Sequence, residues 1–169
     1  MAKLNILTIP DKRLKTKAVA VEQFDSGLKT LVADMLETMY AAPGIGLAAT
    51  QVDVHKRVVV LDISEDKDQP LCLINAKITN KTGHQVHEEG CLSIPNIYAK
   101  VKRAESIEVE AQNEKGEVFQ LQAEGLLAIC IQHELDHLEG VVFLDHLSPL
   151  KRKMALKKLE KEKQESEND

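Results

Sequence analysis

The sequence has few cysteines and no long apolar run, and each shortage excludes a class of protein. No apolar stretch approaches the roughly 20 residues that a membrane-spanning helix needs. Residues 1–10 also lack the apolar core of a signal peptide. Three cysteines in a chain without an export signal favour reduced thiols over a disulfide framework. We therefore expect a cytoplasmic protein that does not bind membranes.

Positive charge is also in short supply. The chain has 22 Lys and Arg against 27 Asp and Glu, a net charge of −5, which argues against non-specific binding to DNA by the domain as a whole. Its 169 residues, 43% hydrophobic and 29% charged, suit one globular domain with a substantial core. Internal repeats and Pro/Gly/Ser-rich linkers are absent from the sequence, so we place no boundary before residue 147.

The spacing of hydrophobic residues predicts an α+β fold. Apolar residues recur at helical intervals over residues 26–40 and again over 124–139. Between them, the β-branched run 58–61 predicts a buried strand, and the alternating segments 106–110 and 119–122 predict a hairpin of half-buried strands. This order favours mostly antiparallel sheets wrapped around a central helix at 124–139, with a further helix at the C-terminus.

The segment 132–137, QHELDH, places the pattern H-E-x-x-H on the second of these helices. Helix positions four apart lie on one face, roughly 5–6 Å apart at Cβ, so the imidazoles of His133 and His137 can bind one metal ion. Glu134 can then reach a water molecule as general base, which is typical of metal-dependent hydrolases. The pattern also arises by chance on amphipathic helices, but the apolar stretch 126–131 favours a buried site.

Spacing alone leaves the third metal ligand open. Catalytic sites of this kind usually have three protein ligands. The longer motif that ends in a third histidine fails here, because position 143 is Phe. Glu160 and Glu162 lie in a charged tail that is typical of a solvated helix. Cys91 has glutamates, glycine and serine around it and can supply a thiolate, although a lone cysteine is often only a small buried hydrophobe.

The segment 44–49 formally satisfies the dinucleotide-binding pattern G-x-G-x-x-G/A. That pattern requires a strand before it and a helix after it, whereas here the predicted helix 26–40 precedes and the strand at 58–61 follows. We therefore reject a nicotinamide site. We interpret the segment as a glycine-rich loop whose backbone comes close to a peptide substrate.

Three segments occur in the order GIGLAATQ at 44–51, EGCLS at 89–93 and QHELDH at 132–137. Together they resemble the three signature motifs of the peptide deformylase family, and the resemblance runs from about residue 3 to about residue 160. It implies an enzyme that removes the formyl group from the N-terminal formyl-methionine of new proteins. Two alternatives are a zinc endopeptidase that shares H-E-x-x-H and a non-catalytic metal-binding module.

The resemblance also implies the chemistry of the centre. It makes Cys91, His133 and His137 the ligands of one divalent metal ion, which is Fe²⁺ in the cell, with Zn²⁺, Ni²⁺ or Co²⁺ able to replace it. It makes Glu134 the group that accepts the proton of the attacking water and delivers it to the leaving amine.

The oxyanion donors and the peptide-binding residues follow from the resemblance as well. The donors are the Gln51 side-chain amide and the Leu92 backbone N–H. His87 and Tyr98 depart from the usual pattern, so the preference for residues beyond methionine does not follow from the family. The residues implied to line the methionine slot, or to pair with the extended peptide, are Ile45, Gly46, Gly90, Leu126, Ile129 and Cys130.

A final helix begins at residues 148–149 and is strongly basic. Seven basic residues stand against two acidic ones between positions 151 and 163, and the acidic tail 165–169 is expected to fray. One interpretation is a solvated surface helix. The other, implied by relatives with such a helix, is docking to the ribosome through residues 148–163. We therefore predict a catalytic domain over residues 1–147 and an appended helix and tail over 148–169.

Overall fold

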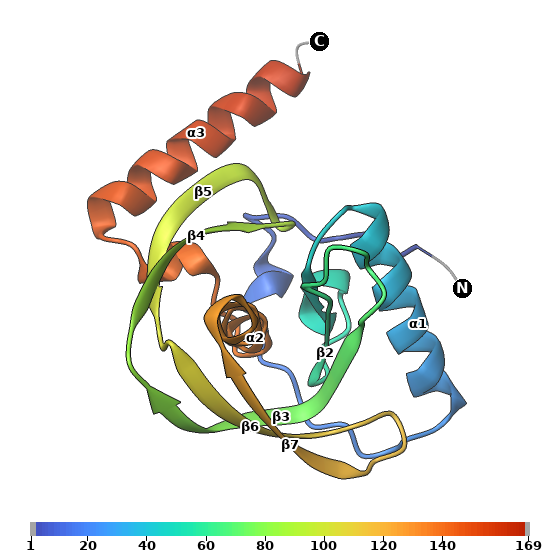
Figure 1. The fold of residues 1–169 in the computed structure, drawn as a ribbon. Coiled ribbons are helices and arrows are strands. Elements are labelled where there is room, and N and C mark those ends of the chain that lie inside the picture. The colour runs from blue at the N-terminus through green and yellow to red at the C-terminus, as the bar shows by residue number, and fades with distance from the viewer. Residues whose placement is uncertain (1–2, 168–169) are drawn as a thin grey trace.

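A computed structural model, which describes residues 3–167, shows two antiparallel sheets curved around a central helix (Figure 1). That helix, α2 (Gly125–Leu138), is seen end-on in the middle of the view, while α1 (Ser26–Ala41) lies against β2 on the outer side. Among the described residues, no helix is both long and apolar enough to cross a bilayer. The five-stranded sheet has the order β1 (Gly46–Ala48), β2 (Val58–Leu61), β3 (Leu71–Thr82), β6 (Ser106–Gln112) and β7 (Val118–Glu124), and the two-stranded sheet pairs β4 (Gln85–Cys91) with β5 (Ile94–Arg103).

Strand β2 is buried on both faces because a helix covers each side of the sheet at that point. Val59 and Leu61 belong to a cluster that includes Ile131 of α2. Val58 and Val60 belong to a second cluster, with the apolar face of α1. A strand covered on both faces has no need of polar residues, which explains the continuous run of apolar side chains.

The N-terminus of α1 and the loop after it lead the chain towards β1. The Asp25 carboxylate caps the helix by accepting a hydrogen bond from the Leu28 backbone N–H at 3.0 Å. Past its last turn, the Gly44 N–H donates to the Met39 carbonyl at 2.7 Å. The backbone then enters β1 at Gly46, at the edge of the five-stranded sheet, and β1 contacts α2.

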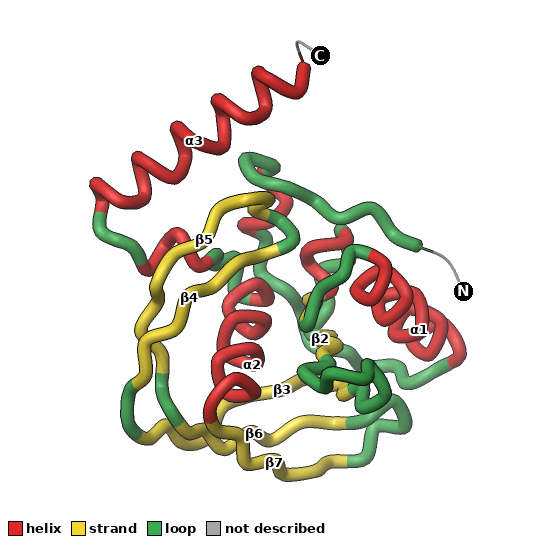
Figure 2. The backbone as a smooth tube through the Cα atoms, turned by 45° about the horizontal axis from the view of Figure 1, so that its top comes forward, coloured by secondary structure: helices red, strands yellow, loops and turns green. Residues whose placement is uncertain are grey.

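Helix α3 (Pro149–Glu167) runs alongside β5 and then projects away from the body of the protein (Figure 2). Its contact with the body is mainly apolar: Ala155 and Leu159 pack against a third cluster that contains Phe143 and Leu144 of the short helix η3 (Phe143–His146). An ion pair between Arg152 and Asp145, at 3.2 Å, joins the same two helices. Two further 3-10 helices, η1 (Lys12–Lys15) and η2 (Ala49–Val52), complete the described secondary structure.

The predicted fold class is confirmed, and both predicted internal helices lie within one or two residues of α1 and α2. The predicted hairpin is longer than expected and corresponds to β6 and β7. The interpretation of the glycine-rich segment as a loop is wrong in part, because residues 46–48 form β1 and pair with β2. Helix α3 is continuous to Glu167, and residues 168–169 lie outside the described residues, so fraying of the tail stays a prediction.

Candidate metal centre

Three potential metal ligands converge beside α2. His133 and His137 project from one face of the helix, with their Nε2 atoms 3.3 Å apart. Cys91, at the end of β4, brings its Sγ to 3.3 Å from Nε2 of His137. All three ligand atoms lie within 4.8 Å of one another. Metal bonds of about 2.0–2.3 Å at tetrahedral angles require donors roughly 3.3–3.8 Å apart, so these separations suit one metal ion.

The two histidines differ in their protonation, and both can present Nε2 to a metal. The Nδ1 atom of His133 is 2.9 Å from Oε1 of Glu89, which identifies Nδ1 as the protonated nitrogen and leaves Nε2 as the donor to a metal. His137 has no exposed surface, and burial lowers its pKa well below the usual range, so that its ring stays neutral. Burial acts to lower the pKa of His133, but its contacts with Cys91 and Glu89 raise that pKa well above the usual range, so this ring must give up a proton when a metal binds. The donor set is then a thiolate and two neutral imidazoles, which is typical of Zn²⁺ and Fe²⁺ sites.

A chain of ion pairs and hydrogen bonds, buried at Glu89 and Arg103 and partly exposed further out, holds Glu89 in place. Arg103, at the end of β5, donates from Nε to Oε2 of Glu89 at 2.6 Å and from its second terminal nitrogen to Oε1 at 2.9 Å. Its remaining terminal nitrogen donates to Asp136 at 2.8 Å, and Asp136 lies 2.8 Å from the His146 ring. Burial alone would raise the pKa of Glu89, but the hydrogen bonds from His133 and Arg103 hold it at about 2. Glu89 is therefore a permanent anion that orients His133.

Glu134 is the one acidic side chain of the H-E-x-x-H segment that faces the centre without a hydrogen-bond partner of its own. Its Oε1 lies 4.0 Å from Nε2 of His137 and has no partner among the described residues. A Cβ atom at Gly46 would lie 2.6 Å from the other carboxylate oxygen, so the glycine leaves the space that the carboxylate occupies. Burial raises the pKa of Glu134 to about 7, which is the range in which a carboxyl group both accepts and donates protons at neutral pH.

The Gln51 side chain, carried by η2, is fixed at both ends. Its Oε1 accepts from the Ala48 N–H at 2.9 Å, and its Nε2 donates to Ser93 Oγ at 3.0 Å, with Cys91 Sγ at 3.6 Å. This orientation turns the amide N–H₂ towards the metal centre. Leu92 follows Cys91 in the turn from β4 to β5, and its side chain packs against Gly44.

A cleft of about 670 Å³ opens above the centre. Its lining includes Ile45 and Gly46 at the start of β1 and Gly90 near the end of β4. The cleft also contains the predicted apolar residues of α2, which are Leu126, Ile129 and Cys130. Of the predicted site residues, the structure brings all to this cleft except His137, which is buried beneath it.

Sequence reasoning missed several residues of the site. Ile6, Pro43 and Asn96 line the cleft from segments that carry no motif. Arg103 was also missed, because it follows Lys100 and Lys102 in a basic stretch in which nothing marks one residue as buried in an ionic contact. Contacts of this kind depend on the register of the β4–β5 hairpin, which the sequence does not reveal by itself.

The fold and the metal centre together define the class of protein to which this chain belongs. A Cys/His₂ cluster on a helix, next to a buried carboxyl group and at the floor of a peptide-sized cleft, is the arrangement of a metal-dependent hydrolase.

Comparison with known proteins identifies the family within this class. The family model for polypeptide deformylase matches residues 3–153. The peptide deformylase of Pseudoalteromonas translucida is 59% identical over 96% of this chain and 97% of its own, and that of Neisseria gonorrhoeae is 60% identical over 95% and 96%. A crystal structure of a peptide deformylase from Legionella pneumophila superimposes with a TM-score of 0.95 at 47% identity, covering 99% of both chains. A peptide deformylase from Ehrlichia chaffeensis, solved in complex with actinonin, gives a TM-score of 0.91 at 42% identity over 96% of this chain and 98% of that one.

The chain therefore belongs to the peptide deformylase family. Membership makes it a metal-dependent hydrolase that removes the N-formyl group from formyl-methionyl nascent proteins. The endopeptidase and the non-catalytic module considered from the sequence are accordingly set aside.

Proposed function

We propose that Cys91, His133 and His137 hold one divalent metal ion and that Glu134 moves the proton during hydrolysis of the formyl amide. The observation that carries this proposal is the convergence of three ligand atoms within 4.8 Å at the floor of the cleft, beside an unpartnered buried carboxyl group. When bound, the metal supplies Lewis-acid chemistry, since it polarises the formyl carbonyl and makes water more acidic.

We propose Fe²⁺ as the cellular metal, with Zn²⁺, Ni²⁺ or Co²⁺ able to occupy the same ligands. The donor set supports this range, because one thiolate and two imidazoles bind all four ions and affinity alone does not select among them. Metal analysis of the protein purified from its own cells without oxygen identifies the resident ion, and a predominance of Zn²⁺ would contradict the proposal.

Glu134 accepts a proton from the attacking water and delivers it to the amine that leaves. Its position supports both steps, because the carboxylate is buried at the floor of the cleft and is held between Gly46 and the His137 ring. A positioned acid–base typically contributes about 10²–10⁴-fold to the rate.

We assign the oxyanion donors to the Gln51 amide and the Leu92 backbone N–H. The Gln51 N–H₂ is preorganised, because its hydrogen bonds to Ala48 and Ser93 prevent the amide from rotating. Loss of one such donor typically lowers turnover by about 10²–10³. Gln51→Ala should therefore bind formyl peptides but turn them over slowly.

The cleft is assigned to the first residues of the nascent chain. Leu126, Ile129 and Cys130 form the apolar slot for the methionine side chain, and the backbone of Ile45, Gly46 and Gly90 pairs with the extended peptide. The position of β1 at the edge of its sheet supports this pairing, because an edge strand has backbone groups free to pair with an added strand. Nascent formyl-methionyl chains arise in the cytoplasm, and we place the enzyme there.

The decisive experiment measures formate release from formyl-Met-Ala-Ser by the protein purified without oxygen in the presence of Fe²⁺. Cys91→Ala should lose bound metal and activity together, whereas Glu134→Gln should keep the metal and lose about 10²–10⁴ in turnover. Acetyl-Met-Ala-Ser serves as the control substrate. Full activity in Glu134→Gln would remove this residue from the mechanism.

We also propose that residues 1–147 form the catalytic domain and that residues 148–163 dock the enzyme to the ribosome. The basic side chains of α3 support docking, because they are exposed along a helix that projects from the body (Figure 2). A variant with Lys157, Lys158 and Lys161 changed to Glu should pellet with ribosomes less than the native chain does, while formate release stays unchanged. Equal pelleting of both proteins would contradict docking through α3.

A further inference from the structure

The ionic contacts behind His133 continue past Arg103 to the surface of the protein. Arg103 bridges two carboxylates, because it holds both oxygens of Glu89 and also donates to Oδ2 of Asp136 at 2.8 Å. Nε2 of His146 lies 2.8 Å from the same Oδ2. The exposed fraction of the side chain rises along this path, from 4% for Glu89 to 28% for Asp136 and 39% for His146. The outermost side chain of the path is therefore His146.

The orientation of the Asp136 side chain depends on this histidine. Among residues 3–167, the Asp136 carboxylate has two hydrogen-bond partners, Arg103 and His146, and both meet the same oxygen. Since an ionised carboxylate only accepts hydrogen bonds, Nε2 of His146 carries the proton and donates it. Two donors that converge on one oxygen restrict a partly exposed side chain, which would otherwise turn towards water. His146 therefore keeps Asp136 where it receives the Arg103 guanidinium.

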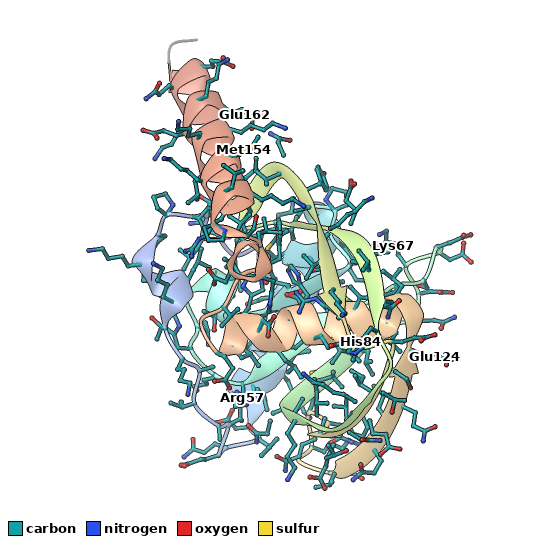
Figure 3. The ribbon with its side chains drawn as sticks, turned by 90° about the vertical axis from the view of Figure 1, so that its left-hand side faces the viewer. Arg57, Lys67, His84, Glu124, Met154 and Glu162 are labelled. Carbon is teal, nitrogen blue, oxygen red and sulfur yellow. The ribbon has the colours of Figure 1, made fainter. Side chains whose placement is uncertain are left out.

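The end of α2 explains how a residue ten positions along the chain returns to Asp136. Gly140, at a φ of +77°, donates to the His137 carbonyl at 3.0 Å, and the N–H of Val141 donates to the Asp136 carbonyl at 2.9 Å. This pair of hydrogen bonds is the Schellman motif, which ends a helix in a defined direction. In Figure 3, α2 runs across the view, and the chain turns back above it before it enters α3. The turn places η3, and with it His146, beside α2.

The position of His146 is fixed because η3 is itself anchored in the body of the protein. Phe143 is 1% exposed and belongs to the third hydrophobic cluster. The Asp145 carboxylate closes the first turn of η3 by accepting a hydrogen bond from the Val142 N–H at 3.0 Å. The ring of Phe143 also lies 6.2 Å from that of His133, measured between centroids. An anchored η3 presents its histidine in one place.

We propose that His146 is a positioning residue for the metal centre. Its hydrogen bond fixes Asp136, and Asp136 then fixes the outer end of the Arg103 guanidinium. Arg103 in turn sets the Glu89 carboxylate that orients His133. This inference rests on the proposed function, because it takes His133 as a ligand of the metal. His146 does not line the active-site cleft, so it acts on the centre through these contacts and not through the substrate.

The test uses the full-length protein loaded with Co²⁺, whose thiolate complex absorbs visible light, and follows the release of the metal to excess EDTA. Loss of a group in direct contact with a metal ligand typically lowers metal affinity by about 10–100-fold. His146 lies three contacts further out than Glu89, so we expect His146→Ala to release Co²⁺ about 3–10-fold faster than the native chain. His146→Gln keeps an N–H donor and should release Co²⁺ at the native rate. Circular dichroism should show that both variants are folded like the native chain.

The matched control is His84→Ala, which removes an exposed imidazole that makes no hydrogen bond or ion pair within residues 3–167 (Figure 3). It should release Co²⁺ at the native rate. Equal rates for His146→Ala and His84→Ala would overturn the inference. Release from His146→Gln as fast as from His146→Ala would also contradict it, because the hydrogen bond would not be the cause.

A double-variant cycle tests the path through Asp136. If His146 acts through this residue, Asp136→Ala and the double variant Asp136→Ala/His146→Ala should release Co²⁺ at the same rate. Effects that multiply would reject the path and would leave the packing of Phe143 against His133 as the cause.

Cys91→Ala tests the proposed function separately, because it removes the thiolate whatever the state of His146. This variant should lack the thiolate absorption of bound Co²⁺. If the absorption remained, the assigned metal ligands would be wrong, and the inference about His146 would fall with them.

Discussion

Gly46 is the single residue on which the position of the Glu134 carboxylate most directly depends. We expect Gly46→Ala to retain metal but to lose about a hundredfold in kcat/KM, because the new Cβ would lie 2.6 Å from Oε2 of Glu134 and would displace it. The measurement is formate release together with the metal content of the purified variant.

Gly27→Ala provides the comparison for that variant. Its added Cβ would meet only the Asp25 carboxylate, at 3.3 Å, at the N-terminus of α1 and away from the cleft. It should leave kcat/KM unchanged. If Gly46→Ala were as active as Gly27→Ala, Glu134 would not require its present position.

At the scale of residues, the sequence predicts only those contacts of the site that join residues a few positions apart. The i, i+4 relation of His133 and His137 follows from helix geometry, and it was visible without a structure. The hydrogen bond from His133 to Glu89 joins residues 44 apart, and the ion pair from Glu89 to Arg103 joins residues 14 apart across a hairpin. Neither contact has a local pattern, so neither could be predicted from spacing.

Arg103 links the β4–β5 hairpin to α2, and at the scale of elements it is the contact whose loss should cost most. Its side chain is 5% exposed and Glu89 is 4% exposed. We expect Arg103→Leu to lower the free energy of unfolding by about 3–5 kcal/mol, because the Glu89 charge would remain buried without its partner. Urea unfolding followed by circular dichroism measures the change.

The exposed ion pairs of Arg13 with Asp11 and Asp53 are the control for that experiment. The Arg13 side chain is 53% exposed, so solvent screens its charge. Arg13→Leu should leave the unfolding midpoint nearly unchanged. A similar midpoint for the two variants would show that the buried network does not hold the hairpin to α2.

The strands differ in how far sequence could predict them, for reasons visible in their environment. Strand β2 is a run of four apolar residues, which suits a strand that helices cover on both faces. Such a run is visible in the sequence, and it predicts the strand. Strands β3 and β4 contain register shifts, between Ile74 and Lys77 and between Glu89 and Cys91, which break the alternation that identifies a strand. Strand β1 has only three residues, too few for any periodicity to appear.

At the scale of the whole molecule, the stability of the folded protein in acid depends on Asp62, which is hydrogen-bonded to Tyr40 of α1. Its carboxylate accepts hydrogen bonds from the Ser64 hydroxyl, from the Tyr40 hydroxyl at 2.6 Å, and from the backbone N–H groups of Ser64 at 2.9 Å and Gln69 at 3.2 Å. Burial acts to raise the pKa of Asp62, but these hydrogen bonds lower it from 3.8 to about 2. A pKa that is lower in the folded state gives stability above about pH 4, and that stability is lost as the pH falls towards 2.

We therefore expect Asp62→Asn to be less stable than the native chain near pH 6 and to approach it near pH 2. Thermal unfolding at intervals across this range measures the difference. Asp66→Asn, in the same loop, controls for the removal of one negative charge. A constant difference between Asp62→Asn and the native chain at every pH would contradict the assignment.

The burial of β2 between α1 and α2 also has a consequence for how the protein opens. Local unfolding exposes amides one region at a time, and the region with most covering structure opens last. The amide hydrogens of residues 58–61 should therefore be among the slowest to exchange with deuterium, since both helices must separate before solvent reaches them. Helix α3 touches the body through few side chains, so its amide hydrogens should exchange first. This local unfolding of α3 should leave the strands and helices around the metal centre folded.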